Sequence, residues 1–103
     1  MSFTGNESHN ITLTEAAQMT ENYRDAHPGA TKGFFYGKAA LQNILNQANC
    51  VGIRIYYAQD NAGQPKLVLV GADGNENDLY NGELAEFGAP CPDHCGNANP
   101  LNS

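Results

Sequence analysis

The sequence predicts a single α+β domain in which two N-terminal helices pack on a small antiparallel β-sheet centred on a hairpin. Three observations support this prediction. The segments Cys50–Ala58 and Lys66–Ala72 are rich in β-branched and aromatic residues, and a polar turn separates them. Two earlier segments repeat apolar residues at helical spacing. A chain of 103 residues has room for one domain with its own core.

The N-terminal residues 1–10 are polar, and we expect them to be flexible, so the predicted domain covers residues 11–103. A helix should begin after Thr12, because Thr12 and Glu15 have the spacing of a capping box. Pro28 should end this helix. The apolar positions expected to face the core are Leu13, Ala16, Met19, Tyr23 and Ala26.

The middle of the chain supplies a second helix and a short aromatic segment. Residues 31–36 predict a brief extended segment or a loop that fills the core, with a third strand of the sheet as a further option. Residues 38–47 predict a helix whose buried face includes Ile44 and whose exposed face carries amides rather than charges. Such an amide-rich face is compatible with either solvent or a packing partner.

The hairpin has two different strands. In the first, Val51, Ile53, Ile55 and Tyr57 alternate with other residues and form one apolar face. The second contains an unbroken apolar run from Leu67, which is typical of a strand covered on both faces. Further along, residues 83–87 predict a single helical turn.

The charge distribution restricts the class of partner. The net charge is −6, and the excess of acids lies entirely after Gln59, where seven acidic residues face one lysine. A chain without a basic cluster is not expected to bind nucleic acid, since Lys and Arg supply most of the affinity for phosphates. No stretch approaches the roughly 18 apolar residues of a membrane span, and the N-terminus lacks signal-peptide features. We therefore expect a cytoplasmic protein without membrane contacts.

Soft metal ligands are concentrated in the cysteine-containing tail. Pro92 suits the first position of a helical turn that would have Cys91 as its N-cap. Such a turn would place ligands at positions i, i+3 and i+4 on one face, as a zinc or iron site requires. The predicted ligands are Cys91, His94 and Cys95, with Cys50 as the fourth and His27, His9 or water as substitutes.

Two other interpretations of the tail remain open. Cα atoms four residues apart on a helix are about 6 Å apart, which is within disulfide range, so Cys91 and Cys95 are also candidates for a thiol-redox pair. Alternatively, the cysteines are purely structural, with Cys50 acting as a small buried apolar residue. An odd total of three cysteines makes a disulfide framework unexpected.

Two other places carry candidate ligand-binding residues. Arg54 lies in the middle of an apolar strand, so it must reach water, pair with an acid such as Asp73 or Asp78, or anchor an anionic ligand. The alternation of Asp73, Asn75, Asn77 and Asp78 is similar to the start of a calcium loop. The glycine and glutamate that an EF-hand requires later in that loop are missing, and the same residues are common in ordinary turns.

The hairpin and tail together resemble a group of small bacterial proteins with no assigned function. The likeness rests on GIRIYYA, on LVLVGAD and on a C-terminal APCPDHC followed by PLN. Related proteins carry a G-I-R-x-Y hairpin, a V-G-x-D and a terminal C-P-x-x-C. The resemblance implies no activity.

The sequence therefore predicts a binding or interaction module rather than an enzyme. Serine is confined to the termini, and no nucleotide-binding or zinc-protease motif is present, so no catalytic residues are predicted. The partner is an unspecified protein or small molecule, with a homodimer formed through the sheet or the amide-rich helix as one option. The alternative function is metal binding or thiol redox chemistry at the tail.

Overall fold

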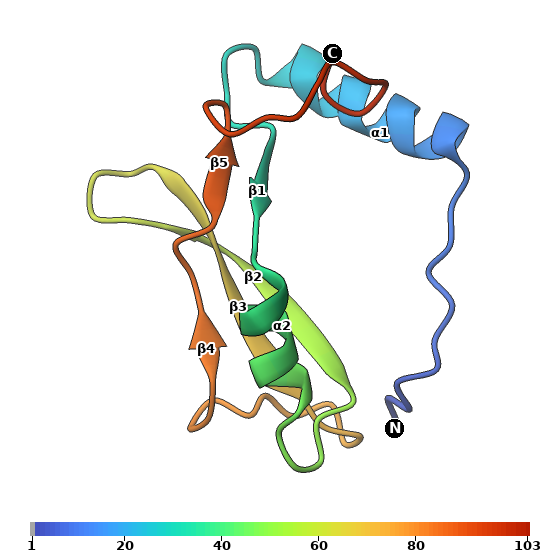
Figure 1. Cartoon of the computed structure of the whole chain (residues 1–103), viewed down its shortest axis with the longest axis vertical. Coiled ribbons are helices and arrows are strands. Elements are labelled where there is room, and N and C mark those ends of the chain that lie inside the picture. Colours follow the sequence, from blue (N-terminus) through green and yellow to red (C-terminus); the bar gives the residue numbers. More distant parts are fainter. Residues whose placement is uncertain (1) are drawn as a thin grey trace. The chain divides into compact units, whose positions relative to one another are not determined.

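The computed structural model describes residues 2–103; residue 1, the first of the segment expected to be flexible, lies outside the described residues. Its elements, in chain order, are α1 (Leu13–Ala26), β1 (Gly33–Phe35), α2 (Lys38–Leu45), β2 (Gly52–Gln59), β3 (Pro65–Ala72), β4 (Leu84–Ala85) and β5 (Ala89–Cys91) (Figure 1). Over the described residues, two helices combine with two small antiparallel sheets, which confirms the α+β class.

The described chain divides into two compact units, where the sequence predicted one domain from residue 11 onward. Residues 2–7 and 36–88 form the first, which we call the hairpin unit, and residues 8–35 and 89–103 form the second, the tail unit. Each has its own sheet, of order β2-β3-β4 in the hairpin unit and β1-β5 in the tail unit. The two predicted helices therefore belong to different units, α2 to the first and α1 to the second.

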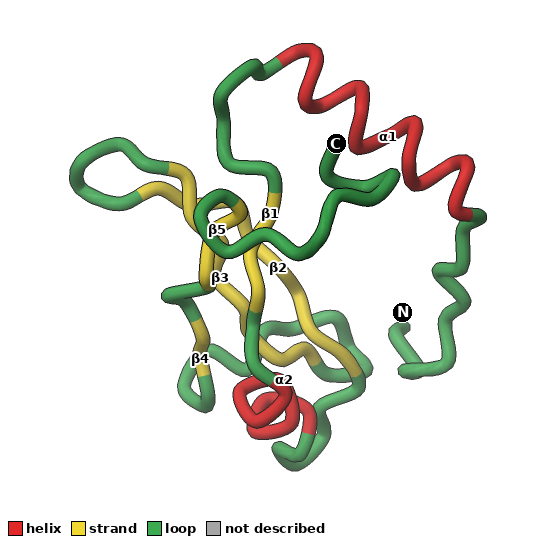
Figure 2. The backbone as a smooth tube through the Cα atoms, turned by 45° about the horizontal axis from the view of Figure 1, so that its top comes forward, coloured by secondary structure: helices red, strands yellow, loops and turns green. Residues whose placement is uncertain are grey.

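The predicted hairpin is confirmed with nearly the expected bounds. β2 and β3 pair antiparallel from Gly52↔Ala72 to Gln59↔Pro65. The turn between them forms because Asp60 Oδ1 accepts hydrogen bonds from two main-chain N–H groups of the turn, each at 2.9 Å. The turn end of the hairpin extends away from α2 (Figure 2).

The core of the hairpin unit is centred on β3, whose last residues are buried on both faces of the sheet, with α2 on the face to which position 71 points. Ile44 of α2 and Leu69, Val70 and Ala72 of β3 are its buried apolar residues. A Cβ atom on Gly71 would lie 2.9 Å from Cys50 Sγ and 3.3 Å from Ile44 Cγ2. The sheet therefore needs glycine at this position, because any side chain would push the segment of α2 away from β3.

The prediction of a helical turn at residues 83–87 was wrong. Leu84 and Ala85 instead form β4 and pair with Val70 and Leu69 of β3. A single helical turn has few internal hydrogen bonds, whereas the free edge of β3 offers main-chain partners, so pairing in the sheet overrides the local preference.

The tail unit is organised by β1 and β5. The aromatic run does form a strand, but it pairs with β5, in register Gly33↔Cys91 to Phe35↔Ala89, and not with the hairpin. Lys32 N donates to Cys91 O at 2.6 Å and extends this ladder. Cys91 is therefore the last residue of a strand and not the predicted N-cap of a helical turn, because strand pairing sets its backbone.

Helix α1 begins at the predicted capping box. Thr12 Oγ1 accepts from Glu15 N at 3.1 Å, and Glu15 Oε1 accepts from Thr12 N at 3.0 Å. The prediction that its apolar face lies in the core was wrong, because no residue of α1 is buried and Met19 is 63% exposed. The helix predicted from the spacing of apolar residues does form, but no surface of the tail unit buries its apolar face.

Candidate functional site

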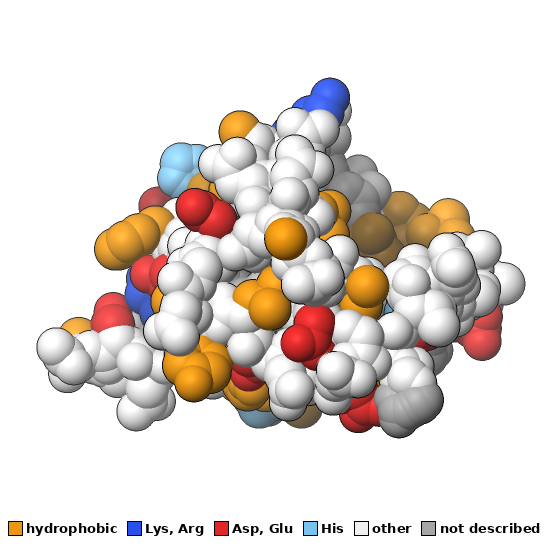
Figure 3. Space-filling model, turned by 90° about the horizontal axis from the view of Figure 1, so that it is seen from below, with side chains coloured by type: hydrophobic (Ala, Val, Ile, Leu, Met, Phe, Trp, Pro, Cys, Tyr) orange, Lys and Arg blue, Asp and Glu red, His pale blue; other side chains and the backbone are white. Residues whose placement is uncertain are grey.

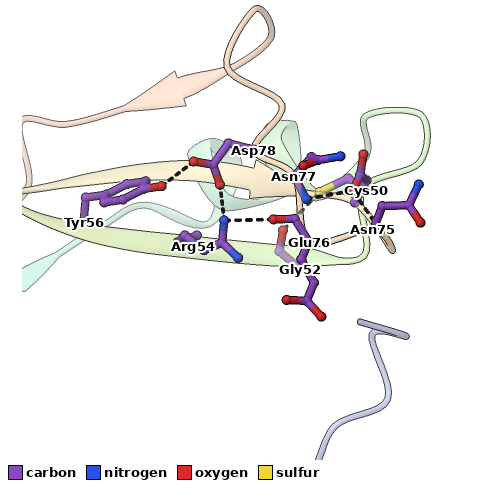
Figure 4. A network of polar contacts seen from close by, with 9 residues as sticks. Cys50, Gly52, Arg54, Tyr56, Asn75, Glu76, Asn77 and Asp78 are labelled. Carbon is purple, nitrogen blue, oxygen red and sulfur yellow. Dashed lines mark hydrogen bonds and ion pairs between the residues drawn. The ribbon is translucent and has the colours of Figure 1, made fainter. Parts of the chain in front are cut away.

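Arg54 of β2 lies at the centre of a polar network on one face of the hairpin unit (Figure 4). Its Nη1 atom is 2.5 Å from Asp78 Oδ1 and donates to Glu76 O at 3.2 Å. The other carboxylate oxygen of Asp78 accepts from the hydroxyl of Tyr56, two residues further along β2. The ion pair expected for Arg54 is therefore confirmed, with Asp78 as its partner.

The network keeps Arg54 charged and in place. The hydrogen bond that Arg54 donates to Asp78 is the largest cause that raises the pKa of Arg54 above its ordinary value. The guanidinium also lies over the ring of Phe3, with its central carbon 5.5 Å from the ring centroid. Since Asp78, Glu76 and Phe3 already occupy it, the arrangement fits a structural role, and the use of Arg54 as a ligand anchor stays a prediction.

The segment that is similar to a calcium loop forms a hydrogen-bonded turn. Asp73 Oδ1 accepts from Asn75 N at 2.9 Å and from Asn77 N at 3.0 Å. Asp78, the last of the four predicted ligands, is the partner of Arg54. Both carboxylates thus bind donors of the protein itself, and Asp73 has the role that Asp commonly has in tight turns.

The cysteines fall into two groups. Cys91 and Cys95 form a disulfide with their Cα atoms 4.6 Å apart, so the two cysteines are paired, whereas a thiol-redox role stays a prediction. Cys50 belongs to the hairpin unit, has a free thiol and donates from Sγ to Gly52 O at 3.2 Å. Within residues 2–103, no three His, Cys, Asp or Glu side chains gather closely enough to hold a metal. The zinc or iron site with Cys91, His94, Cys95 and Cys50 therefore stays a prediction for the reduced chain.

A cavity of about 110 Å³ adjoins the disulfide loop within the tail unit. Its lining includes Tyr23, Arg24 and His27 from the end of α1, Lys32 before β1, and Pro92 from the loop between the two cysteines. No sequence pattern associates these residues, because they are up to about 70 positions apart and carry no shared motif.

The cationic side chains of this cavity also hold the C-terminal residues. Arg24 donates from Nη1 to Leu101 O at 2.8 Å and from Nη2 to Ser103 O at 2.7 Å. Lys32 Nζ donates to Asn102 O at 2.8 Å. These contacts fix the positions of the two charged groups at the cavity.

The outer edge of the hairpin unit is formed by β2, which pairs with β3 on one side only among the described strands. Large apolar side chains are exposed along it, with Ile55 56% exposed and Tyr57 96% exposed. On the face of the molecule that Figure 3 shows, hydrophobic and acidic side chains are interspersed. The alternating pattern predicted this apolar face of β2, but the sequence did not indicate that α2 would leave part of it uncovered.

A second polar contact joins Tyr36, which precedes α2, to strand β3. The hydroxyl of Tyr36 donates to Leu67 O at 3.0 Å. Burial raises the pKa of Tyr36, and the negative charge of Glu86 raises it further. Glu86 Oε2 is buried and has no hydrogen-bond partner among the described residues.

Comparisons of the chain with protein-family models, with curated proteins and with solved structures gave no match. The resemblance to a group of small bacterial proteins therefore stays a prediction. Neither helix of residues 2–103 has the length and apolar character that a membrane crossing needs.

Proposed function

We propose that the protein is a non-enzymatic interaction module that associates with a second copy of itself through the free edge of β2. The observation that carries this proposal is the combination of an eight-residue edge strand with the exposed side chains of Ile55 and Tyr57. An edge strand presents unpaired main-chain N–H and C=O groups, which favour pairing with another strand.

The strand lacks the features that usually prevent edge pairing. Natural edge strands commonly carry lysine, proline, a bulge or a charged residue that faces inward. β2 pairs with β3 without interruption and contains no lysine or proline. Its one charged residue, Arg54, is already neutralised by Asp78 on the other face of the sheet from Ile55.

The sequence of β2 is also complementary to itself. In a two-fold antiparallel pairing centred on Ile55, each Ile53 stands opposite the Tyr57 of the second copy, and the two Ile55 side chains stand opposite each other. On the other face, each Arg54 stands opposite a Tyr56, so no like charges meet. A second copy therefore fits this edge better than a partner with a charged strand.

The association should be weak. The exposed aromatic side chain of Tyr57 and its neighbours supply a few hundred Å² of apolar area per copy, against about 800 Å² in a standard interface. We therefore expect a dissociation constant of about 10 μM or weaker.

Light scattering after size exclusion tests the proposal when it is run from about 1 μM to about 1 mM protein. The mass should rise toward that of a dimer, and Ile55→Lys should abolish the rise because it places two ammonium groups opposite each other. Asn43→Lys adds the same charge to the exposed face of α2 and serves as the control. A monomer at every concentration contradicts the proposal, and so does a dimer that only Asn43→Lys disrupts.

A second candidate function, thiol–disulfide chemistry, is favoured by the Cys91–Cys95 disulfide. In the cytoplasm, where the sequence predicts the protein to reside, disulfides are usually transient and catalytic or redox-sensing. The test is a count of free thiols in the native and denatured protein, with metal content measured on the same sample. One free thiol per chain without reductant, that of Cys50, would support the redox pair. Three thiols together with bound zinc or iron would support the metal site instead of the redox pair.

A further inference from the structure

The disulfide of the tail unit has one accessible sulfur-bearing residue and one that the fold holds in place. Cys95 is exposed, whereas Cys91 is partly buried at the end of β5 and paired with Gly33. An incoming thiolate therefore reaches the Cys95 side of the bond more easily, and Cys91 is the leaving group.

The cavity that Pro92 of the disulfide loop lines contains two cationic side chains, in a protein whose net charge is −6. Arg24 and Lys32 line it together with His27, and no Asp or Glu is part of the lining. Arg24 uses two of its five N–H donors and Lys32 uses one of its three to hold the C-terminal residues. Both side chains therefore retain donors for an anion.

The size of the cavity limits what it accepts. A volume of about 110 Å³ fits a carboxylate with a few attached carbons and does not fit a whole peptide. Pro92, which lines the cavity, is bonded directly to Cys91. A small thiol that carries a carboxylate can thus place its acid among the cations while its sulfur approaches the disulfide.

We propose that the Cys91–Cys95 disulfide exchanges with a low-molecular-weight acidic thiol whose carboxylate binds Arg24 and Lys32. This inference rests on the second candidate function and names its substrate class. The thiolate attacks Cys95 Sγ, the S–S bond breaks, and Cys91 leaves as a thiolate that takes up a proton. A second thiol then attacks the mixed disulfide at the sulfur of the first. Two acidic thiols are oxidised to one disulfide, and the protein disulfide is reduced to two thiols.

The test compares two small thiols of opposite charge, mercaptoacetate and cysteamine, on the full chain. Cys50→Ser serves as the background, so that only the pair reacts. The rate of mixed-disulfide formation is followed by acid quench, alkylation and mass spectrometry. Each rate is divided by the rate of the same thiol with 2-hydroxyethyl disulfide, which removes differences in intrinsic reactivity. We expect a normalised preference for mercaptoacetate of about tenfold, the lower end of electrostatic focusing effects.

Two variants test whether the preference for the acidic thiol comes from the cavity. Lys32→Gln and Arg24→Gln should each reduce the preference at least several-fold, whereas Lys66→Gln, an equal change of charge in the hairpin unit, should leave it intact. Loss of the C-terminal contacts in these variants would affect both thiols alike, so the ratio isolates the anion site. Equal normalised rates for the two thiols overturn this inference but leave thiol exchange standing. Absence of exchange with either thiol overturns both this inference and the second candidate function.

Discussion

Arg54 and Asp78 join the edge strand of the hairpin unit to the segment that follows β3, with 2.5 Å between Nη1 and Oδ1. The same carboxylate accepts from the hydroxyl of Tyr56, so it holds two side chains on one face of β2. Ala72, at the end of β3, forms a bridge with Asp78, which brings the carboxylate into position. One face of β2 is thus tied down by polar contacts, while the opposite face carries exposed Ile55 and Tyr57.

The first prediction concerns this shared carboxylate. Asp78→Asn should lower the free energy of unfolding more than Tyr56→Phe, which should cost about 1 kcal/mol as the loss of one hydrogen bond. Urea unfolding followed by circular dichroism measures both. Glu83→Gln, which removes an equal charge from an exposed site, should have little effect. A cost for Asp78→Asn no larger than that of Glu83→Gln would show that the network contributes nothing to stability.

The second prediction concerns the contact of α2 with β3. Gly71→Ala should destabilise the protein by about 1–3 kcal/mol, because the new Cβ would overpack the core. It would stand 2.9 Å from both Cys50 Sγ and Gln47 Nε2, and Gln47 is held by its bonds to Ile44 O and Glu83 N. Thermal unfolding gives the comparison with Gly52→Ala, whose Cβ meets no atom within 4 Å. Equal melting temperatures for the two variants would contradict the packing described for α2.

The third prediction concerns the start of α1. Thr12→Ala should lower the stability of the tail unit by about 1 kcal/mol through the lost cap. Thr14→Ala, one position inside the helix, is the control, since no hydrogen bond of its side chain is needed to begin the helix. Amide hydrogen exchange in residues 13–16 measures the effect, and protection that is equal in the two variants would mean that the cap does not stabilise α1.

The same cap has a pH dependence. Hydrogen bonds from the backbone and side chain of Thr12 lower the pKa of Glu15 below 4.5, its value in the unfolded chain. A lowered pKa means that the contribution is present above pH 4.5 and is lost as the pH falls through the folded pKa. The stability difference between the protein and Glu15→Gln should therefore shrink in acid. A difference that stays constant from neutral pH into acid would rule this contribution out.

The fourth prediction concerns Tyr36 at alkaline pH. Burial, and then the charge of Glu86, raise its pKa above 10.0. The neutral hydroxyl is favoured in the folded state, so this contribution is complete below pH 10 and is lost as the pH rises through the folded pKa. Chemical unfolding from pH 8 to 11 should show a decline in stability that is smaller in Tyr36→Phe. The stability of Tyr57→Phe, which changes an exposed tyrosine, should decline as much as that of the unchanged protein. If the stability of Tyr36→Phe declines by the same amount as well, Tyr36 is not the source of the decline.

Local patterns were sufficient for the elements that depend on near neighbours. The capping box placed the start of α1, and the alternation in the segment from Ile53 to Tyr57 placed β2 with its correct partner across the turn. The ion pair of Arg54 was also predictable, because a guanidinium in an apolar strand needs an acid and Asp78 follows the strand that pairs with β2 across the turn. In each case the partner lies within the same helical turn or is brought alongside by the hairpin.

Tertiary structure alone decided which segments meet. The aromatic run of β1 pairs with β5, more than fifty residues away, and this pairing makes Cys91 a strand residue; β4 likewise becomes a strand through the edge of β3. The cavity with Arg24, Lys32 and Pro92 exists only because that long-range pairing brings the cysteine loop to the end of α1. Hydrophobic periodicity predicts that one face of an element is buried. It does not identify the segment that covers this face, because apolar contact is not directional. The sequence by itself therefore determined the local elements and the chemistry available, and the long-range pairing decided where that chemistry is assembled.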